Sequence, residues 1–249
     1  MKSLAFYSIK GGVGKTAMAV NIAYHTAVHL GLRTLLIDLD PQGSAGFYFR
    51  VHARSKAKAK DLFKGNKQLQ KMIRESDFKN LDIIPAIQGF RNVDKYLASE
   101  SHKKKQFDLL LEHFDDEYDR IIIDSPPHFG ISSENIFLAA DFIVVPVIPS
   151  ILSQRTLEQL VEFFTLKGYK RDKIIAFFSM VDTRKKLHKE TISILSAGPT
   201  PFLNTAIPYA SAIEKMGIHR APVCTFAAKQ KAALAVHDLA EELERLEVI

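Results

Sequence analysis

The sequence has little cysteine and lacks any long hydrophobic run. Its 249 residues include one cysteine, Cys224, and no tryptophan. One cysteine excludes an internal disulfide and a Cys-x-x-Cys metal or redox pair. The longest apolar runs, such as residues 142–148, are far shorter than the roughly 20 residues that span a bilayer. The residues after Met1 do not resemble a signal peptide. We therefore expect a cytoplasmic globular protein.

Positive charge is unevenly distributed along the chain. The formal net charge is +6, and residues 51–105 contain fourteen Lys or Arg against six Asp or Glu. Such a surplus suggests an anionic partner, such as nucleic acid or a membrane surface, but a solvated helical face explains it equally well. We expect the stretch 49–80 to be mostly helical, and the role of the basic segment 51–105 stays open.

Short apolar segments alternate with helical patterns along the chain. Continuous apolar runs are typical of parallel strands that are buried on both faces. Their alternation with helices predicts βαβ units, and hence one α/β domain over 1–249 with a doubly wound, mostly parallel sheet flanked by helices. The predicted strands are 4–9, 34–39, 81–85, 120–124, 142–147 and 173–181, and the predicted helices are 16–30, 133–140, 153–164, 187–195 and 230–246.

A glycine-rich segment lies between the first predicted strand and the first predicted helix. Gly11, Gly12 and Gly14 allow the backbone to wrap closely around phosphate oxygens. The N-terminus of the following helix favours anions. Lys15 is placed to reach the β- and γ-phosphates of a nucleotide, and Thr16 to offer its hydroxyl to Mg²⁺. The segment therefore predicts a nucleotide-binding phosphate loop.

A second lysine, Lys10, makes this loop a deviant Walker A motif, Lys-Gly-Gly-x-Gly-Lys-Thr. Two further motifs accompany it: Asp-Leu-Asp-Pro-Gln-Gly at 38–43, and an apolar strand that ends in Asp-Ser-Pro-Pro at 124–127. Together the three motifs resemble the ParA/MinD family of P-loop ATPases. The Pro-Gln pair after Asp40 resembles ParA, of the Soj-like partition type, more than MinD. The resemblance extends over nearly the whole chain.

The resemblance implies a role for several side chains. Lys10, Lys15 and Asp40 would be catalytic: Asp40 would orient the attacking water, and Lys10 would reach the ATP of a partner subunit. Asp124 would hold Mg²⁺, through a water because Mg²⁺ loses its hydration shell reluctantly. Asp38 would support the Mg²⁺ shell, although the alternative of an aspartate that caps the following turn fits Asp38 better than Asp40. The expected nucleotide-binding residues are Lys10, Gly11, Gly12, Val13, Gly14, Lys15, Thr16, Ala17, Met180, Pro208 and Tyr209, and the expected metal residues are Thr16, Asp38 and Asp124.

The resemblance also implies a function. It predicts a partition or positioning ATPase that uses ATP and Mg²⁺, forms a homodimer on ATP binding and hydrolyses ATP slowly. The expected partners are non-specific DNA of the nucleoid and a ParB-like or other cargo adaptor. A predicted helix start at 184–189 can present basic groups to phosphates, and we place His188 on this surface, but a solvated helix start is an equal alternative. The candidate DNA-binding residues are Arg184, Lys185, Lys186, Arg220, Lys229 and Lys231.

Other functions remain as alternatives. A MinD-like membrane ATPase would end in a basic amphipathic helix, but the tail after His237 is acidic and would be repelled by an anionic leaflet. We therefore expect no membrane partner. A redox relative would need paired cysteines, whereas Cys224 is expected to be a buried apolar residue. A metabolic synthetase would lack Lys10, and the intact motifs disfavour an adaptor without hydrolysis. The sequence does not identify the cargo.

Overall fold

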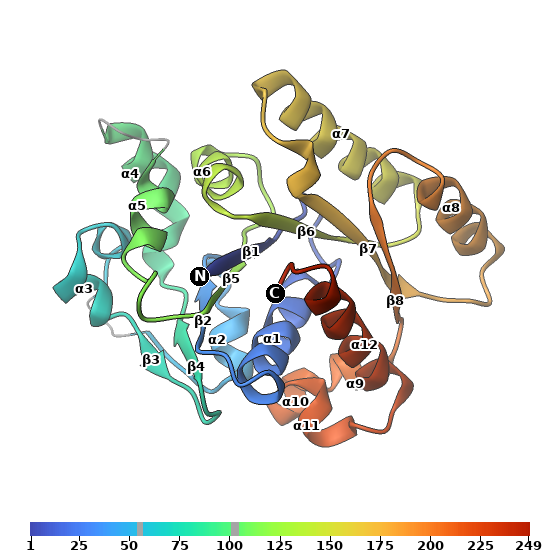
Figure 1. Ribbon diagram of the computed structural model, residues 1–249, viewed down its shortest axis with the longest axis horizontal. Coiled ribbons are helices and arrows are strands. Elements are labelled where there is room, and N and C mark those ends of the chain that lie inside the picture. The colour runs from blue at the N-terminus through green and yellow to red at the C-terminus, as the bar shows by residue number, and fades with distance from the viewer. Residues whose placement is uncertain (54–56, 101–104) are drawn as a thin grey trace.

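The computed structural model describes residues 1–53, 57–100 and 105–249, and an eight-stranded sheet crosses its centre (Figure 1). The strands are β1 (Lys2–Phe6), β2 (Thr34–Asp38), β3 (Arg74–Glu75), β4 (Leu81–Ile84), β5 (Arg120–Asp124), β6 (Phe142–Val147), β7 (Ile174–Val181) and β8 (Phe202–Pro208). Their order is β3-β4-β2-β5-β1-β6-β7-β8. Every neighbouring pair is parallel except β3 with β4. The predicted doubly wound, mostly parallel sheet is confirmed.

Helices cover both faces of this sheet (Figure 1). The α-helices are α1 (Lys15–Tyr24), α2 (Ser44–Tyr48), α3 (Asn66–Gln70), α4 (Val93–Ser99), α5 (Gln106–Glu112), α6 (Ile131–Ala139), α7 (Ile151–Lys167), α8 (Lys186–Ser196), α9 (Ser211–Glu214), α10 (Met216–His219), α11 (Val223–Ala227) and α12 (Lys231–Arg245). A π-helical turn, η1 (His25–His29), extends α1, and 3₁₀ turns lie at η2 (Ala59–Leu62), η3 (Gln88–Asn92) and η4 (Arg171–Lys173). Helices α4 to α7 lie on one face, and α1 and α12 lie on the other (Figure 1).

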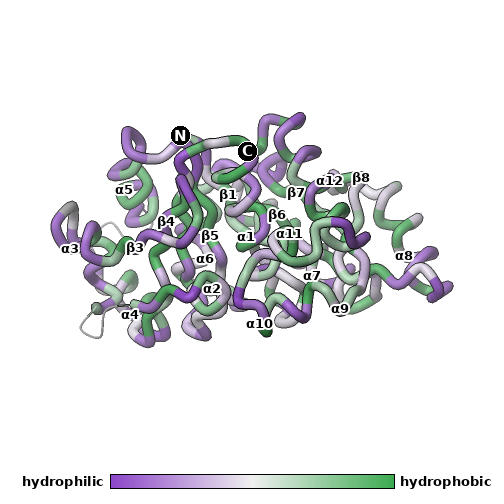
Figure 2. The backbone as a smooth tube through the Cα atoms, turned by 90° about the horizontal axis from the view of Figure 1, so that it is seen from below, coloured by the Kyte–Doolittle hydropathy of each residue, from purple (hydrophilic) through white to green (hydrophobic). Residues whose placement is uncertain are grey.

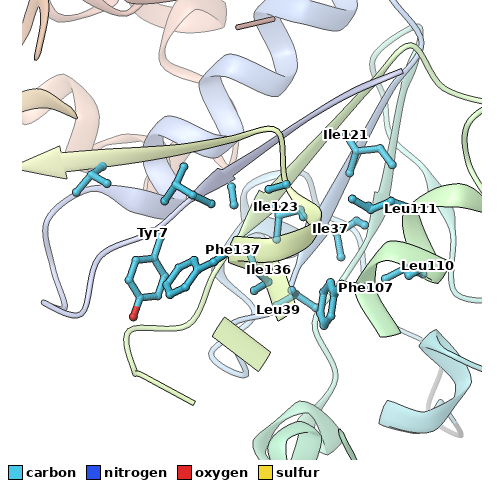
Figure 3. Packing of buried hydrophobic residues seen from close by; sticks show 14 of the residues in the cluster. Tyr7, Ile37, Leu39, Phe107, Leu110, Leu111, Ile121, Ile123, Ile136 and Phe137 are labelled. Carbon is cyan, nitrogen blue, oxygen red and sulfur yellow. The ribbon is translucent and has the colours of Figure 1, made fainter. Parts of the chain in front are cut away.

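The core is divided into two layers by the sheet. Successive side chains of a strand point to opposite faces, so Leu4 and Phe6 pack with α1 and α12 while Ala5 and Tyr7 pack with the opposite helices. Figure 3 shows Tyr7 beside Phe137 of α6, and the two ring centroids are 4.7 Å apart. Burial on both faces explains why the strands are continuously apolar.

The stretch 49–80 is not mostly helical, so that expectation is wrong. Its described part contains only η2, the short helix α3 and the two-residue strand β3, while residues 54–56 lie outside the described chain. Alanine and lysine alternate with a period of two at 57–60, which places the alanines on no single helical face. Gly65, with φ of 86°, further separates η2 from α3.

Several element boundaries also differ from the predictions. The first strand ends at Phe6 rather than residue 9, because the chain leaves the sheet to form the glycine loop. The predicted helix 16–30 is α-helical only to Tyr24 and then widens into η1. The wider turn places the rings of His25 and His29 5.0 Å apart, and both lie near His237 of α12. Neither β3 nor β8 appears in the predicted strand list.

The C-terminal helix is fastened to the edge strand β8. The Glu242 carboxylate accepts hydrogen bonds from the backbone N–H groups of Asn204 (2.7 Å) and Thr205 (2.8 Å). Val248 and Ile249 are buried in the core, and the two chain ends lie side by side (Figures 1 and 2). Figure 2 shows hydrophobic stretches gathered in the middle, while α3 at one edge is hydrophilic. None of the helices in the described ranges is long and apolar enough to cross a membrane.

Candidate nucleotide site

The glycine loop between β1 and α1 has the backbone geometry that a phosphate-binding loop requires. Gly12 and Gly14 have φ values of 71° and 95°, in the left-handed region that favours glycine. A Cβ added at Gly14 would lie 3.1 Å from the Ser179 hydroxyl, whereas a Cβ at Gly11 or Gly12 would meet no heavy atom within 4 Å. The loop backbone at Gly11 and Gly12 is therefore open to a ligand.

The start of α1 is available to an anion. Within the described chain, no side chain caps this helix, and its first turn carries no acidic residue. The N–H groups of the first turn are thus free to bind a ligand, and the helix dipole favours negative charge there. The Ser179 hydroxyl of β7 donates to the Val13 carbonyl (2.9 Å) and so fixes the loop from behind.

Two aspartates lie side by side at the carboxyl ends of neighbouring strands. Asp38 of β2 pairs in register with Asp124 of β5, and both side chains are fully buried. The Asp38 carboxylate accepts hydrogen bonds from the backbone N–H groups of Ala45 (3.0 Å) and Gly46 (3.3 Å) in α2, and from the N–H of Asp40 (3.2 Å). Asp38 therefore caps the turn into α2.

The Asp124 carboxylate has the opposite environment. Neither of its oxygens has a hydrogen-bond partner of ordinary geometry among the described residues. Burial raises the pKa of Asp124 to about 7; the nearby Thr16 hydroxyl and Lys15 ammonium offset part of this rise, and Asp40 adds to it. Burial and the charge of Asp124 likewise raise the pKa of Asp38 well above its usual range. Two adjacent buried carboxylates beside a single lysine are electrostatically costly.

A bound cation would relieve this cost. Lys15 is buried in the same place; burial lowers its pKa, while the charges of Asp124 and Asp40 raise it. Among the described residues, no group of three or more His, Cys, Asp or Glu side chains could hold a metal by itself. Mg²⁺ takes one or two protein oxygens and completes its shell with waters and phosphates, so it does not need such a group. The Asp124 carboxylate and the Thr16 hydroxyl fit this ion.

Asp40 and Lys10 flank the loop. Asp40 follows β2, is half-buried, and accepts a hydrogen bond from the N–H of Gln42 (3.0 Å). Lys15 donates to the Lys10 carbonyl (3.4 Å), and the Lys10 ammonium donates to the Ser153 hydroxyl (3.2 Å) at the start of α7. The structure thus brings Lys10, Lys15, Thr16, Asp38, Asp40 and Asp124 together.

The residues expected at the adenine lie at the neighbouring strand ends. Pro208 of β8 pairs with Val181 of β7, and the N–H of Tyr209 donates to the Val181 carbonyl (3.0 Å). The methyl carbon of Met180 would lie 3.9 Å from a Cβ on Gly14, so Met180 borders the glycine loop. Tyr209 is exposed, and its hydroxyl donates to Glu214 (3.0 Å). Ala17 is half-buried in the first turn of α1.

The candidate DNA-binding residues form two separate groups. Helix α8, which begins at Lys186, packs into the core layer with α7, whereas α11 and α12 pack into the opposite layer. Arg184 is paired with Asp182 (2.9 Å), and the Arg220 guanidinium lies 4.8 Å from the Phe47 ring centroid. The four candidate lysines, Lys185, Lys186, Lys229 and Lys231, are exposed and take no part in the Arg184 ion pair or the Arg220 ring contact. Lys186 pairs with Glu190 (3.5 Å).

Two expectations about single side chains change. His188 is not part of an exposed surface: it is buried, and its Nδ1 accepts a hydrogen bond from the N–H of Asp182 (3.1 Å). A helix that packs on the sheet must bury one side, and His188 lies on that side with Thr191 and Leu195. Cys224 is half-buried against the core, as a small apolar residue would be, and burial raises its thiol pKa.

Sequence reasoning missed one pair near the site, Asp94 and His128. Asp94 is in α4, and His128 directly follows the two prolines after Asp124. The imidazole Nε2 lies 3.3 Å from the Asp94 carboxylate. His128 directly follows the Asp-Ser-Pro-Pro motif at 124–127, so its position in the sequence could have marked it as a residue near the site. Nothing in the sequence places Asp94 beside it.

Comparisons with known proteins agree with this geometry. A family model described as an AAA domain matches residues 1–175. The chain is 31% identical to the chromosome-partitioning ATPase Soj of Treponema pallidum, over 97% of this chain and 96% of that protein. The chain belongs to the ParA/MinD family of ATPases. This confirms the resemblance found in the motifs.

One further relative supports the placement near ParA, and one solved structure shares the fold. The chain is 33% identical to the virulence plasmid ParA family protein pGP5-D of Chlamydia psittaci, over 78% of this chain and 75% of that protein. A Borrelia burgdorferi protein described as a plasmid partition protein, bound to AMPPNP, shares the fold with a TM-score of 0.85 and 22% identity. That likeness covers 98% of this chain and 99% of the other. The chain is thus a ParA/MinD-family ATPase close to Soj and ParA.

Proposed function

We propose that this ParA/MinD-family protein is a single ATPase domain over 1–249 that partitions or positions a cargo by binding and hydrolysing MgATP. The observation that carries the proposal is the buried Asp124 carboxylate, whose oxygens have no hydrogen-bond partner of ordinary geometry within the described chain although Lys15 and Thr16 lie near. A nucleotide-bound cation satisfies these oxygens. The Borrelia relative, which was solved with AMPPNP, is consistent with a nucleotide at this place.

The roles follow from the positions. Lys15 and the loop N–H groups hold the β- and γ-phosphates, and Thr16 with Asp124 holds Mg²⁺, which neutralises phosphate charge when bound. Asp40, beyond the end of β2, orients the water that attacks the γ-phosphate to give ADP and phosphate. Substitution of Asp40 by alanine should keep ATP binding and slow hydrolysis by about 10²–10⁴-fold. Single-turnover hydrolysis measures this, and unchanged turnover would exclude the role.

A homodimer with ATP at its interface is the second part of the proposal. The Lys10 ammonium contacts Ser153 at the start of α7, and the adjacent Ile151 and Leu152 are 67% and 66% exposed. Exposed apolar residues beside the nucleotide site suit a surface that a second copy covers. Lys10 is then close to the interface and able to reach the partner's phosphates, as an arginine finger does.

Light scattering with ATP, ADP and a non-hydrolysable ATP analogue tests the dimer. Lys10→Ala should abolish the ATP-dependent dimer and keep ADP binding, because Lys15 remains. Lys170→Ala, an exposed lysine outside the glycine loop, is the matched control and should dimerise normally. A Lys10→Ala protein that dimerises and hydrolyses as the wild type does would leave Lys10 without this role.

DNA binding is the third part of the proposal. A dimer doubles the number of exposed lysines that can contact DNA, and so raises avidity for the nucleoid without a new kind of contact. Phosphate contacts carry no base information, so binding should ignore sequence and weaken steeply with salt. Gel shifts with ATP, ADP and no nucleotide test this proposal. Glutamate substitutions at Lys185 and Lys186, against the same change at Lys229 and Lys231, show which of the two groups contacts DNA.

A ParB-like or other cargo adaptor would complete the cycle by accelerating a slow basal hydrolysis in the cytoplasm. The membrane alternative finds no support in α12, which directs its apolar residues Val236, Leu239 and Leu243 into the core. Binding to anionic vesicles in place of DNA would nevertheless overturn the nucleoid proposal.

A further inference from the structure

Three histidines gather where the end of α1 meets the C-terminal helix. His25 and His29 are the first and last residues of the π-helical turn η1, and His237 lies in α12, on the same face of the sheet (Figure 1). The ring centroid of His25 is 5.0 Å from that of His29 and 5.1 Å from that of His237. Single π-helical turns are rare and often mark functional sites. This turn brings together imidazoles that are 212 residues apart in the chain.

Two of these rings bring a nitrogen atom close to one another. The Nδ1 atoms of His25 and His237 are 3.4 Å apart, which is longer than an ordinary hydrogen bond of about 2.7–3.2 Å. Two imidazole nitrogens that bind one tetrahedral Zn²⁺, each at about 2.0–2.1 Å, are separated by about 3.3–3.4 Å. The separation of the two nitrogens therefore fits a shared metal ion better than a direct hydrogen bond.

The other ring nitrogen of His237 has the partner that metal-binding histidines use. Its Nε2 lies 3.1 Å from the carboxylate of Glu241, one turn further along α12. Histidines that bind a metal almost always direct their second ring nitrogen at a carboxylate, a carbonyl or water, which fixes the tautomer. We assign the His237 proton to Nε2, where Glu241 accepts it, and this leaves the Nδ1 lone pair available to a metal.

The pair lies at the protein surface and has two protein ligands. His25 is 3% exposed, whereas the His237 side chain is 44% exposed, so solvent reaches the pair at His237. Within the described ranges, no group of three or more His, Cys, Asp or Glu side chains could hold a metal, so water would complete the coordination shell. Two imidazoles without a carboxylate ligand suit Zn²⁺, Cu²⁺ or Ni²⁺ rather than Mg²⁺.

We propose that His25 and His237 form a binding site for a divalent transition-metal ion of the Zn²⁺ class, which joins the end of α1 to α12 through the two Nδ1 atoms. Glu241 is a positioning residue that orients His237. His25 is about 15 Å along α1 from Lys15, and the site uses no residue of the nucleotide site, so it does not depend on the proposed ATPase function. An ion that binds only the folded chain stabilises it by mass action.

Calorimetric titration of the nucleotide-free protein with ZnCl₂ tests the site, on protein without a polyhistidine tag. The wild type should bind Zn²⁺ and unfold at a higher temperature when ZnCl₂ is present. His237→Gln should weaken Zn²⁺ binding by at least about 10-fold and remove the rise in Tm, and Glu241→Gln should weaken binding by about 10-fold. The matched control is His113→Gln, an exposed histidine after α5, which should bind Zn²⁺ as the wild type does.

Asp124→Asn separates this site from the nucleotide site, whose carboxylate can also attract Zn²⁺. Zn²⁺ binding that persists in Asp124→Asn and is lost in His237→Gln supports the proposal. Binding that is lost in Asp124→Asn and unchanged in His237→Gln overturns it, as does a wild type that binds no Zn²⁺. If His237→Gln fails to fold, imidazole NMR signals of the wild type that do not change with equimolar ZnCl₂ overturn the proposal instead. ATP binding and hydrolysis are measured separately, so either result leaves the proposed function intact.

Discussion

The substitution Gly130→Ala tests how the fold supports the Asp94–His128 pair. Gly130 has φ of −163°, an extended conformation that any residue adopts, so alanine causes no backbone strain there. The effect is steric: the new Cβ would overlap the Asp94 carboxylate. Asp94 must then move, and it loses both the hydrogen bond from the Ser132 N–H and the ion pair with His128.

The expected cost follows from these two contacts. Loss of a carboxylate that caps a helix N-terminus costs about 0.5–2 kcal/mol of stability. The ion pair adds at most about 1 kcal/mol, because the Asp94 side chain is 35% exposed and solvent screens it. The pKa of Asp94, lowered to about 2 mainly by the hydrogen bond with His128, agrees with a favourable but modest pair. Gly130→Ala should therefore lower the free energy of unfolding by about 1–3 kcal/mol.

A double-mutant cycle separates this mechanism from general damage to the loop. Asp94→Ala removes the same two contacts and the carboxylate itself, so Gly130→Ala should cost little more when added to it. The two effects should fall short of additivity by about 1 kcal/mol or more. Urea unfolding followed by far-UV circular dichroism suits this chain, which has no tryptophan. Gly217→Ala, whose Cβ would meet no heavy atom within 4 Å, is the control. Additive effects, or a Gly130→Ala protein as stable as the wild type, would refute the steric explanation.

Three other substitutions test the site and the C-terminal helix. Asp124→Asn should stabilise the nucleotide-free protein at pH 8 on the order of 1–3 kcal/mol, because the raised pKa of Asp124 means that its ionisation opposes folding. This gain should shrink as the pH falls toward about 3.9, the ordinary pKa of an aspartate. Urea unfolding at two pH values measures it. Lys15→Ala should weaken MgATP binding by about 10²-fold or more in a nucleotide titration, because charge-assisted phosphate contacts are strong. Glu242→Ala should cost about 1–3 kcal/mol in the same unfolding assay, because it removes the charged acceptor of the N–H groups of Asn204 and Thr205. Burial raises the pKa of Glu242, but these hydrogen bonds outweigh it and leave the pKa lowered, so the contribution is present above the unfolded pKa and is lost as the pH falls through the folded one.

The parallel sheet and the phosphate loop were predictable because their causes are local. A strand buried on both faces must be apolar throughout, as in 120–124, and a loop that turns with positive φ needs glycine at fixed positions such as Gly12 and Gly14. The edge strand β8 was harder, because only Leu203 and Ile207 among its residues are buried. The helix prediction for 49–80 failed because lysine and alanine have high helix propensity, whereas tertiary packing divides the segment into short turns.

The roles of Asp38 and Asp124 show what the motifs alone do not decide. Both residues end apolar parallel strands, both are fully buried, and they pair in register, so their local sequences predict the same environment. The next residues of the chain separate them. After Asp38 the chain folds back, so that the N–H groups of Ala45 and Gly46 reach its carboxylate. After Asp124 come Ser125 and then two prolines, which have no N–H to donate, and the carboxylate is left without a hydrogen bond of ordinary geometry within the described chain. The proposed metal role therefore fits Asp124 better than Asp38.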